Sequence, residues 1–183
     1  GEKGFFAARV FFILLAGGLP LLTTRLAFSL TQNISYAWLA GILALFSGFY
    51  ALYLSNTESF SPYMTFGALF LMASGSDHLQ SSRWKGLILG LLAGFMHLAR
   101  ADGTLWLFAA LGLNTYEQLR SQKKLSIRWR DGVIHSFLTL SAYFCVMGAW
   151  LLRNLSLYDS FFSPASGKAM WLTQYNDTFI YPA

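Results

Sequence analysis

Residues 36–54 read YAWLAGILALFSGFYALYL, nineteen consecutive residues without a charged side chain. About 20 predominantly apolar residues form a helix that is long enough to cross the hydrocarbon core of a bilayer. Of the 183 residues in the whole chain, 55% are hydrophobic and 17% are aromatic, whereas only 11% are charged. Soluble domains carry about 25% charged residues. The composition therefore excludes a disordered chain, a coiled coil and a nucleic-acid-binding tail, and it predicts an all-α integral membrane protein.

Five further apolar segments accompany this one. The six expected transmembrane helices cover about residues 5–22, 36–54, 60–76, 84–98, 103–119 and 133–152. The sequence GGLP at residues 17–20 is expected to kink or break the first helix, because proline lacks the amide hydrogen that a helix requires. The third and fourth segments are short, and a tilted, re-entrant or partly buried helix is the alternative to a full span for both. The predicted fold is a polytopic bundle of about six helices over residues 1–153.

Residues 154–183 have a different character. They are polar, contain two prolines and interleave aromatic side chains with Ser, Asn and Asp. No helical period persists through them, so they are predicted to form an ordered loop on the membrane surface rather than a domain with its own core.

The basic residues predict an orientation. The linker at residues 120–130 carries five of the thirteen Lys and Arg residues, the linker at 77–85 adds two more, and Arg25 follows the first segment. If the six segments alternate in direction, all three positions fall on the same side of the membrane. Because short cytoplasmic loops are enriched in Lys and Arg, that side is expected to be cytoplasmic and residues 154–183 external.

Several chemistries are excluded by the residues themselves. Cys145 is the single cysteine, so no disulfide can form within the chain, and the three scattered histidines lack zinc-ligand spacing. The glycine-rich stretches lie inside apolar segments, where small residues serve helix packing rather than phosphate binding. Basic and aromatic residues mix only at the membrane interfaces, which argues against nucleic-acid binding. A transporter would place ionisable residues near the middle of the bilayer, and these segments show almost none.

Glu58 is the first candidate site residue, and it directly precedes the segment at 60–76. The helix dipole stabilises a carboxylate at a helix N-terminus by about 0.3–1 kcal/mol, which explains Glu58 without any further role. The alternative is a carboxylate that faces an external cavity and binds a metal or orients a substrate.

Arg100 and Arg153 are the next candidates, because both lie at external helix ends, against the positive-inside tendency. One interpretation is that both side chains anchor the helices at the membrane interface. The other is that the two guanidinium groups form a basic pocket for a phosphate or an anionic headgroup. Near Arg100, His97 is expected to be a hydrogen-bonded packing residue rather than a catalyst, and Asp102 is expected to cap the helix that follows.

The run GLLAGFMHLARADG at residues 90–103 resembles a motif of the GT-C glycosyltransferases, in which a Gly/Leu/Ala helix ends in a Thr-Arg-Pro-Glu/Asp-Gly turn. Ala99 and Ala101 replace the usual Thr and Pro, whereas the arginine, acidic and glycine positions match. WLLRN at 150–154, followed by FSP at 162–164, resembles the family's Trp-x-x-Arg-Asn…Gly-x-Pro segment.

Two more stretches extend the resemblance. KAMWLTQYND at 168–177 is similar to a loop of bacterial mannosyltransferase-like members that use polyprenyl-phosphate mannose, and NTE at 56–58 is similar to the Thr-Asp/Glu that opens a family helix. The motifs lie within residues 55–183 and occur in the family's order. The first fifty residues resemble the family only in their hydropathy.

The resemblance implies that a hexosyl or pentosyl group is moved from a polyprenyl-phosphate carrier to an acceptor on the external face of a bacterial cytoplasmic (inner) membrane. In the family, arginines at the external helix ends hold the carrier phosphate, and matching positions assign this role to Arg100 and Arg153. Glu58 would be a secondary acidic residue that orients the acceptor or a divalent metal. The residues that would line the sugar and acceptor pocket are Trp171, Tyr175, Asp177 and Lys168.

The principal catalytic carboxylate of the family lies in a first external loop, where it acts as base or metal ligand. That loop would precede residue 1, and the sequence begins with Gly1 and no basic leader region, so we expect the chain to be a piece of a longer polypeptide. The expected partners are membrane lipid and the polyprenyl-phosphate sugar. The alternative is a non-catalytic membrane subunit of a larger complex that retains a GT-C-like scaffold, and absence of the carboxylate from the full-length protein would favour it.

Overall fold

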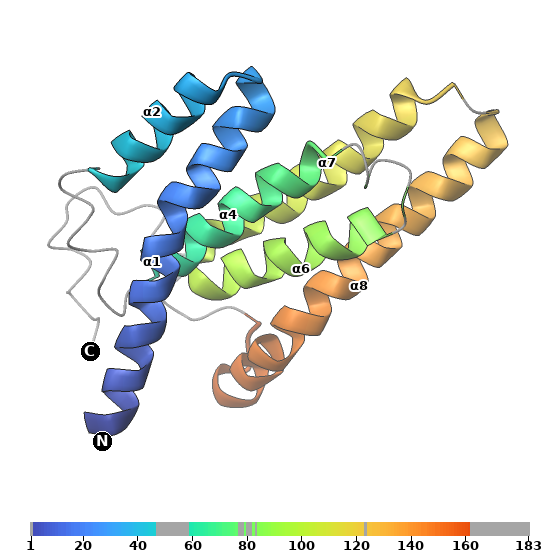
Figure 1. Cartoon of the computed structure of the whole chain (residues 1–183). Helices are drawn as coiled ribbons and strands as arrows, with labels where there is room; N and C mark the ends of the chain where they lie inside the picture. The colour runs from blue at the N-terminus through green and yellow to red at the C-terminus, as the bar shows by residue number, and fades with distance from the viewer. Residues whose placement is uncertain are drawn as a thin grey trace, which may run out of the picture.

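The computed structural model describes residues 2–46, 59–76, 79, 82, 84–122 and 124–161. Within these ranges the regular structure is entirely helical, which confirms the all-α class for this part of the chain. The elements are α1 (Glu2–Thr31), α2 (Ile34–Leu45), α4 (Phe60–Ser74), α6 (Trp84–Ala99), the short 3-10 helix η1 (Ala101–Gly103), α7 (Thr104–Arg120) and α8 (Leu125–Tyr158) (Figure 1).

The apolar segments at 84–98 and 103–119 coincide with α6 and α7 to within one residue at each end. The segment at 60–76 coincides with α4, which ends two residues earlier. Predominantly apolar runs of this kind predict a helix well when turn residues such as Gly103 bound them. In the expected segment at 36–54, the structure describes residues up to 46, of which α2 covers Ile34–Leu45.

Of the kink or break expected at residues 17–20, the break is wrong, because α1 is one helix of 30 residues with Pro20 inside it. Proline removes only one helical amide donor, and the neighbouring turns hold the helix together. The hydroxyl groups of Thr23 and Thr24 each donate a 2.9 Å hydrogen bond, to the carbonyls of Leu19 and Pro20 respectively. These bonds lie in the turn that follows Pro20, whereas the carbonyl that loses its amide donor is that of Ala16, so α1 continues through the backbone hydrogen bonds of its other turns.

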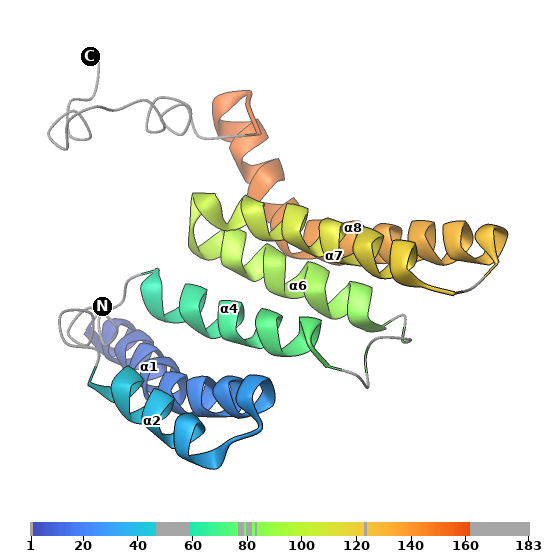
Figure 2. The same cartoon turned by 90° about the horizontal axis from the view of Figure 1, so that it is seen from above.

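The last expected segment, 133–152, is too short at both ends. Helix α8 has 34 residues and begins at Leu125, inside the expected basic linker. It ends at Tyr158, so residues 154–158 are helical rather than part of the surface loop. The last turns of α8 bend away from the direction of the neighbouring helices α6 and α7 (Figure 2). Polar and basic turns at the ends of a helix keep their backbone hydrogen bonds, and hydropathy therefore underestimates its length.

Helix α6 lies at the centre of the bundle and contacts α4, α7 and α8 (Figure 2). The shared core consists of Phe70, Ala73, Leu89, Ala93, Met96, Leu107, Ala110, Tyr143 and Met147. Gly86, Gly90 and Gly94 form a glycine stripe on α6, and a Cβ atom on any of them would meet α8 closely. The sequence-based prediction that small residues serve helix packing is confirmed for these three glycines.

Helices α1 and α2 pack as a pair, and α1 also contacts α4. Gly41 lets α2 approach α1, because a Cβ atom there would overlap the Thr24 hydroxyl. Most of the large apolar side chains of this pair are exposed, among them Phe5, Phe11, Leu21 and Trp38. The composition of this surface is typical of helices that lie against lipid or further protein.

Among the residues that the structure describes, two helical segments are long and apolar enough to cross a membrane: Gly4–Thr31 and Leu125–Tyr158. At 1.5 Å per residue, the 28 residues of the first would rise about 42 Å, more than the roughly 30 Å of a hydrocarbon core. The 16 residues of α6 would rise only about 24 Å.

The helices alternate in direction. The C-terminal ends of α4 and α7 and the N-terminal ends of α6 and α8 lie together at what we call the α7–α8 end of the bundle (Figure 2). The α6–α7 end carries the η1 turn and the C-terminal end of α8. Arg100 and the basic segment at 120–130 are therefore at opposite ends, as the alternation of apolar segments predicts.

Candidate functional site

The turn between α6 and α7 forms the candidate site. Helix α6 ends at Ala99, Arg100 is extended with φ −149° and ψ 143°, and η1 then leads into α7. The Gly103 amide donates a 2.9 Å hydrogen bond to the Arg100 carbonyl, which closes the turn. A Cβ atom on Gly103 would overlap the backbone of Met96 and His97, so only glycine lets the turn fold back onto α6.

The Arg100 guanidinium is held by a carboxylate and by aromatic rings. Its Nε atom donates a 3.1 Å hydrogen bond to Asp102 Oδ1. Its Cζ atom lies 5.0 Å from the ring centroid of Phe60 and 5.6 Å from that of Tyr63, within the range of cation–π attraction. About a third of the Arg100 side chain (35%) stays exposed. The guanidinium is thus oriented by its surroundings and still accessible to an anion.

The predicted capping role of Asp102 is wrong. The residue at the N-cap position of α7 is Gly103, and no side chain caps that helix. Asp102 lies inside η1, and the structure shows its carboxylate paired with Arg100, two residues away. An arginine so close in the chain competes successfully with the backbone amides for the carboxylate.

Tyr63 is itself fixed by α7. Trp106 Nε1 donates a 2.9 Å hydrogen bond to the Tyr63 hydroxyl, and the Trp106 ring meets Phe70 edge to face with centroids 5.0 Å apart. These contacts tie α4 to α7 beside the turn. The aromatic surface below Arg100 is therefore part of the core rather than a mobile cover.

His97 lies beneath the turn and is almost completely buried. Its Nδ1 atom forms a hydrogen bond with the Tyr143 hydroxyl of α8, and Thr104 Oγ1 lies 3.1 Å from its Nε2 atom. Thr104 Oγ1 also donates to the Ala101 carbonyl at 3.1 Å. His97 thus joins α6, α7 and α8, which is the packing role that its position in the sequence favours.

Arg153 lies on the exposed side of α8 and forms no ion pair with another described residue. Helices α6 and α8 run parallel, since Gly86 lies against His135 and Thr139 whereas Gly94 lies against Tyr143 and Val146. Arg100 and Arg153 are therefore at the same end of the bundle, each at the C-terminal end of its helix. No hydrogen bond or shared carboxylate links the two guanidinium groups.

Five of the predicted site residues, namely Glu58, Lys168, Trp171, Tyr175 and Asp177, lie outside the described residues. Within the described ranges no three His, Cys, Asp or Glu side chains are grouped as metal ligands. Cys145 is exposed on α8.

Sequence reasoning missed the most buried charge of the described chain. Lys85, at the start of α6, is fully buried, forms an ion pair with Glu117 of α7 and donates a 2.8 Å hydrogen bond to the Ser74 carbonyl of α4. The sequence interpretation counted Lys85 only as a cytoplasmic basic residue. The sequence does contain a signal for this ion pair. The alternation of helix directions places Lys85 and Glu117, which have opposite charges, at the same end of the bundle.

A second missed residue is Asn154, which directly follows Arg153 and is almost fully buried. Its Nδ2 atom donates a 3.3 Å hydrogen bond to the Phe161 carbonyl, so it fixes the path of the chain just beyond α8. Nothing in the residues around Asn154, which include Arg153 and Ser156, indicates that this amide is buried.

Comparison of the chain with protein-family models, with curated proteins and with solved structures found no match.

Proposed function

We propose that the chain is the membrane-embedded middle part of a GT-C-type glycosyltransferase, which moves a sugar from a polyprenyl-phosphate carrier to an acceptor on the external face of a bacterial inner membrane. The observation that supports this most directly is the set of contacts around the Arg100 guanidinium. Asp102 and Phe60 fix its Nε atom and the face of its guanidinium, whereas its terminal nitrogens form no hydrogen bond with another described residue. This arginine lies in the closing turn of the motif at residues 90–103, which resembles the family.

The chemistry needs a cation at this place. When the acceptor hydroxyl oxygen bonds to the anomeric carbon, its proton passes to the principal carboxylate acting as base, the bond from the anomeric carbon to the carrier phosphate oxygen breaks, and the electron pair of that bond leaves with the phosphate. Negative charge therefore develops on the carrier, and guanidinium groups already in position stabilise it without reorganising. Arg100 binds the phosphate through its terminal nitrogens, and Arg153 supplies a second cation from the neighbouring helix end.

The same proposal assigns the remaining predicted residues. Glu58 orients the acceptor or a divalent metal, and the pocket for the sugar is formed by Lys168, Trp171, Tyr175 and Asp177. The principal carboxylate is supplied by a loop that precedes residue 1. These assignments rest on the motif resemblance.

Membrane insertion through six spans is part of the proposal. It is supported by the two helices of spanning length and by the large apolar side chains exposed on α1, α2 and α8. The basic residues at the α7–α8 end put that end in the cytoplasm, which leaves Arg100, Arg153 and residues 154–183 on the external side.

We expect Arg100→Ala and Arg153→Ala each to lower carrier-dependent sugar transfer by at least about tenfold, which corresponds to about 1.4 kcal/mol of transition-state stabilisation. The reason is that each variant removes one positive charge from the site of the leaving phosphate. The measurement is transfer of radiolabelled sugar from polyprenyl phosphate by the purified full-length protein. Arg130→Ala, which removes an exposed arginine at the opposite end of the bundle, is the matched control and should transfer at the wild-type rate.

Binding is tested separately from transfer. A ligand that binds only the folded state raises the thermal unfolding midpoint. Polyprenyl-phosphate sugar should raise the midpoint of the wild type and of Arg130→Ala, and the increase should be smaller in Arg100→Ala. Wild-type transfer by both arginine variants would refute the phosphate-binding assignment. A midpoint shift without transfer by any full-length form would instead favour the non-catalytic subunit that retains the scaffold.

A further inference from the structure

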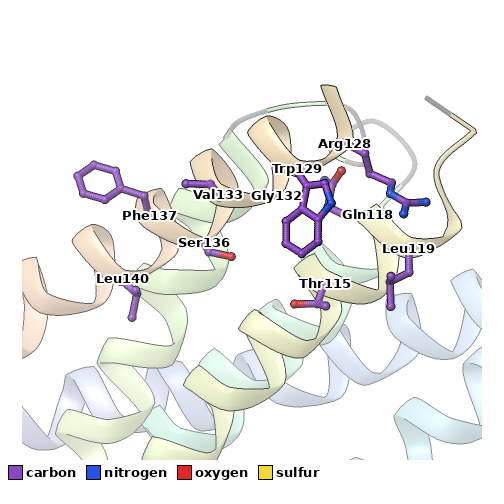
Figure 3. Close-up of a pocket in the computed structure, with 10 residues that line it drawn as sticks. All are labelled: Thr115, Gln118, Leu119, Arg128, Trp129, Gly132, Val133, Ser136, Phe137 and Leu140. Atoms are coloured by element: carbon purple, nitrogen blue, oxygen red, sulfur yellow. The ribbon is translucent and has the colours of Figure 1, made fainter. Parts of the chain in front are cut away.

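A groove lies between α7 and α8 at the end of the bundle opposite to Arg100 (Figure 3). Its volume is about 400 Å³, within the roughly 300–1,000 Å³ of small-molecule sites. Figure 3 shows the Trp129 ring between the two helices, with Arg128 near their connection and Phe137 and Leu140 farther along α8. The groove is therefore apolar along its length and carries its cation at one end.

The walls of the groove suit a hydrocarbon chain. Val133 and Phe137 of α8 expose about two thirds of their surface, at 64% and 66%. Val133 and Phe137 continue the apolar lining along α8 from Trp129 to Leu140. The lining also includes three uncharged polar residues, Thr115, Gln118 and Ser136. An inorganic phosphate ion would gain nothing from contact with these apolar side chains, whereas an acyl chain would bury apolar surface against them.

The mouth of the groove suits an anion. Arg128 is partly buried, and its side chain forms no hydrogen bond or ion pair with another described residue. Arg120 and Lys124 are exposed on either side of the connection between the helices, and they add to the positive potential there. Arg130, by contrast, is 68% exposed, pairs with Asp131 at 3.6 Å and does not line the groove.

We propose that this groove binds one anionic glycerophospholipid of the cytoplasmic leaflet. Its acyl chain lies along Val133, Phe137 and Leu140, and its phosphate is bound by Arg128. A zwitterionic lipid is disfavoured, because its ammonium group would lie among Arg120, Lys124 and Arg128. The inference requires the helices to be in a membrane, but it does not depend on sugar transfer, which is assigned to the opposite end.

Trp129 provides a local probe of the bound lipid. The protein is reconstituted into phosphatidylcholine vesicles that contain a small fraction of phosphatidylglycerol with brominated acyl chains, which quench tryptophan fluorescence on contact. The difference in quenching between the wild type and Trp129→Phe isolates the signal of the groove from that of the other five tryptophans. Brominated phosphatidylcholine in the same amount is the comparison lipid, and we expect it to quench Trp129 less.

We expect Arg128→Gln to weaken the apparent affinity for phosphatidylglycerol by about fivefold, the effect of roughly 1 kcal/mol per basic residue. Arg130→Gln removes the same charge from the same helix outside the groove and should leave Trp129 quenching unchanged. Ser136→Phe fills the groove while keeping every charge, and it should reduce quenching by both lipids. Thermal unfolding of each variant verifies that it is folded.

Two results would overturn the proposal. If Arg128→Gln and Arg130→Gln weakened the apparent affinity for phosphatidylglycerol equally, the anionic lipid would be attracted by diffuse surface charge and not by this groove. Equal quenching of Trp129 by phosphatidylglycerol and phosphatidylcholine would mean that the groove is either bulk-lipid contact or covered by another part of the full-length protein.

Discussion

Glu117→Gln is expected to lower the free energy of unfolding by about 3–5 kcal/mol, the cost of breaking a buried ion pair by removing one partner. The variant keeps the size of the side chain but leaves the fully buried ammonium group of Lys85 without a counter-charge. The Ser74 carbonyl at 2.8 Å and the new amide oxygen can accept hydrogen bonds, but they carry no compensating charge. Helices α4, α6 and α7 meet at Lys85, so loss of its counter-charge weakens the packing of all three helices.

Removing the other partner should cost less. Lys85→Met leaves Glu117, which is 25% exposed and can be hydrated where it stands. The double variant Lys85→Met/Glu117→Leu should recover most of the stability, because an apolar pair of similar volume needs no desolvation of charge. Asp102→Asn breaks a carboxylate pair of the same kind whose partners are 35% and 47% exposed, and it should cost less than about 1 kcal/mol.

The measurement is an unfolding titration of the purified protein in detergent micelles, with all four variants compared under one condition. The expected order of destabilisation is Glu117→Gln, then Lys85→Met, then the double variant and Asp102→Asn. Equal costs for Glu117→Gln and Asp102→Asn would show that Lys85 is hydrated, which contradicts the burial that the prediction uses.

Gly90→Ala is expected to destabilise the protein by about 3 kcal/mol, at the upper end of the usual cost of overpacking a core. A Cβ atom at this position would overlap the backbone of Thr139 on α8. Backbone atoms cannot move aside as the end of a side chain can, so α6 and α8 would have to separate. Thr139 also accepts a 2.9 Å hydrogen bond from Asn114 of α7, and its displacement would disturb this third helix as well.

Two other glycines serve as matched controls. At Gly94 an added Cβ would lie 2.9 Å from Val146 Cβ and 3.2 Å from the Tyr143 carbonyl oxygen, so Gly94→Ala should cost less than Gly90→Ala. Gly112 on α7 has open space around its Cβ position, and Gly112→Ala should be neutral or stabilising by up to about 1 kcal/mol. Thermal unfolding midpoints in one detergent measure the series. A Gly90→Ala variant as stable as Gly112→Ala would contradict the close contact of α6 with α8.

Hydropathy located the helices well where turn residues bound a predominantly apolar run, as at α6 and α7. The break expected at residues 17–20 does not occur, because Pro20 removes one amide donor whereas the other turns of the 30-residue helix α1 keep their hydrogen bonds. Hydropathy failed at both ends of α8, because helical hydrogen bonding continues into polar residues that hydropathy excludes.

For the candidate site, the sequence brought attention to Arg100 and Arg153 from their charge and their position at helix ends. It assigned Asp102 to the wrong partner, since capping and ion pairing use the same carboxylate and only geometry distinguishes them. The aromatic rings of Phe60 and Tyr63 were not connected with Arg100, because about forty residues separate them from it in the chain.

The sequence by itself determined the helical class of the described residues, the positions of the central helices and the opposite placement of Arg100 and the basic segment that begins at Arg120. These properties depend on composition and on local hydrogen bonding, which neighbouring residues specify. Tertiary structure alone decided that Lys85 is buried against Glu117, that His97 joins three helices and that a groove opens beside Arg128. Each of these depends on how closely helices approach one another and on which side chains then meet, and a single segment of sequence specifies neither. The glycine stripe sets the distance between α6 and α8, whereas the pairing of Lys85 with Glu117 and the groove beside Arg128 also involve the packing of α7.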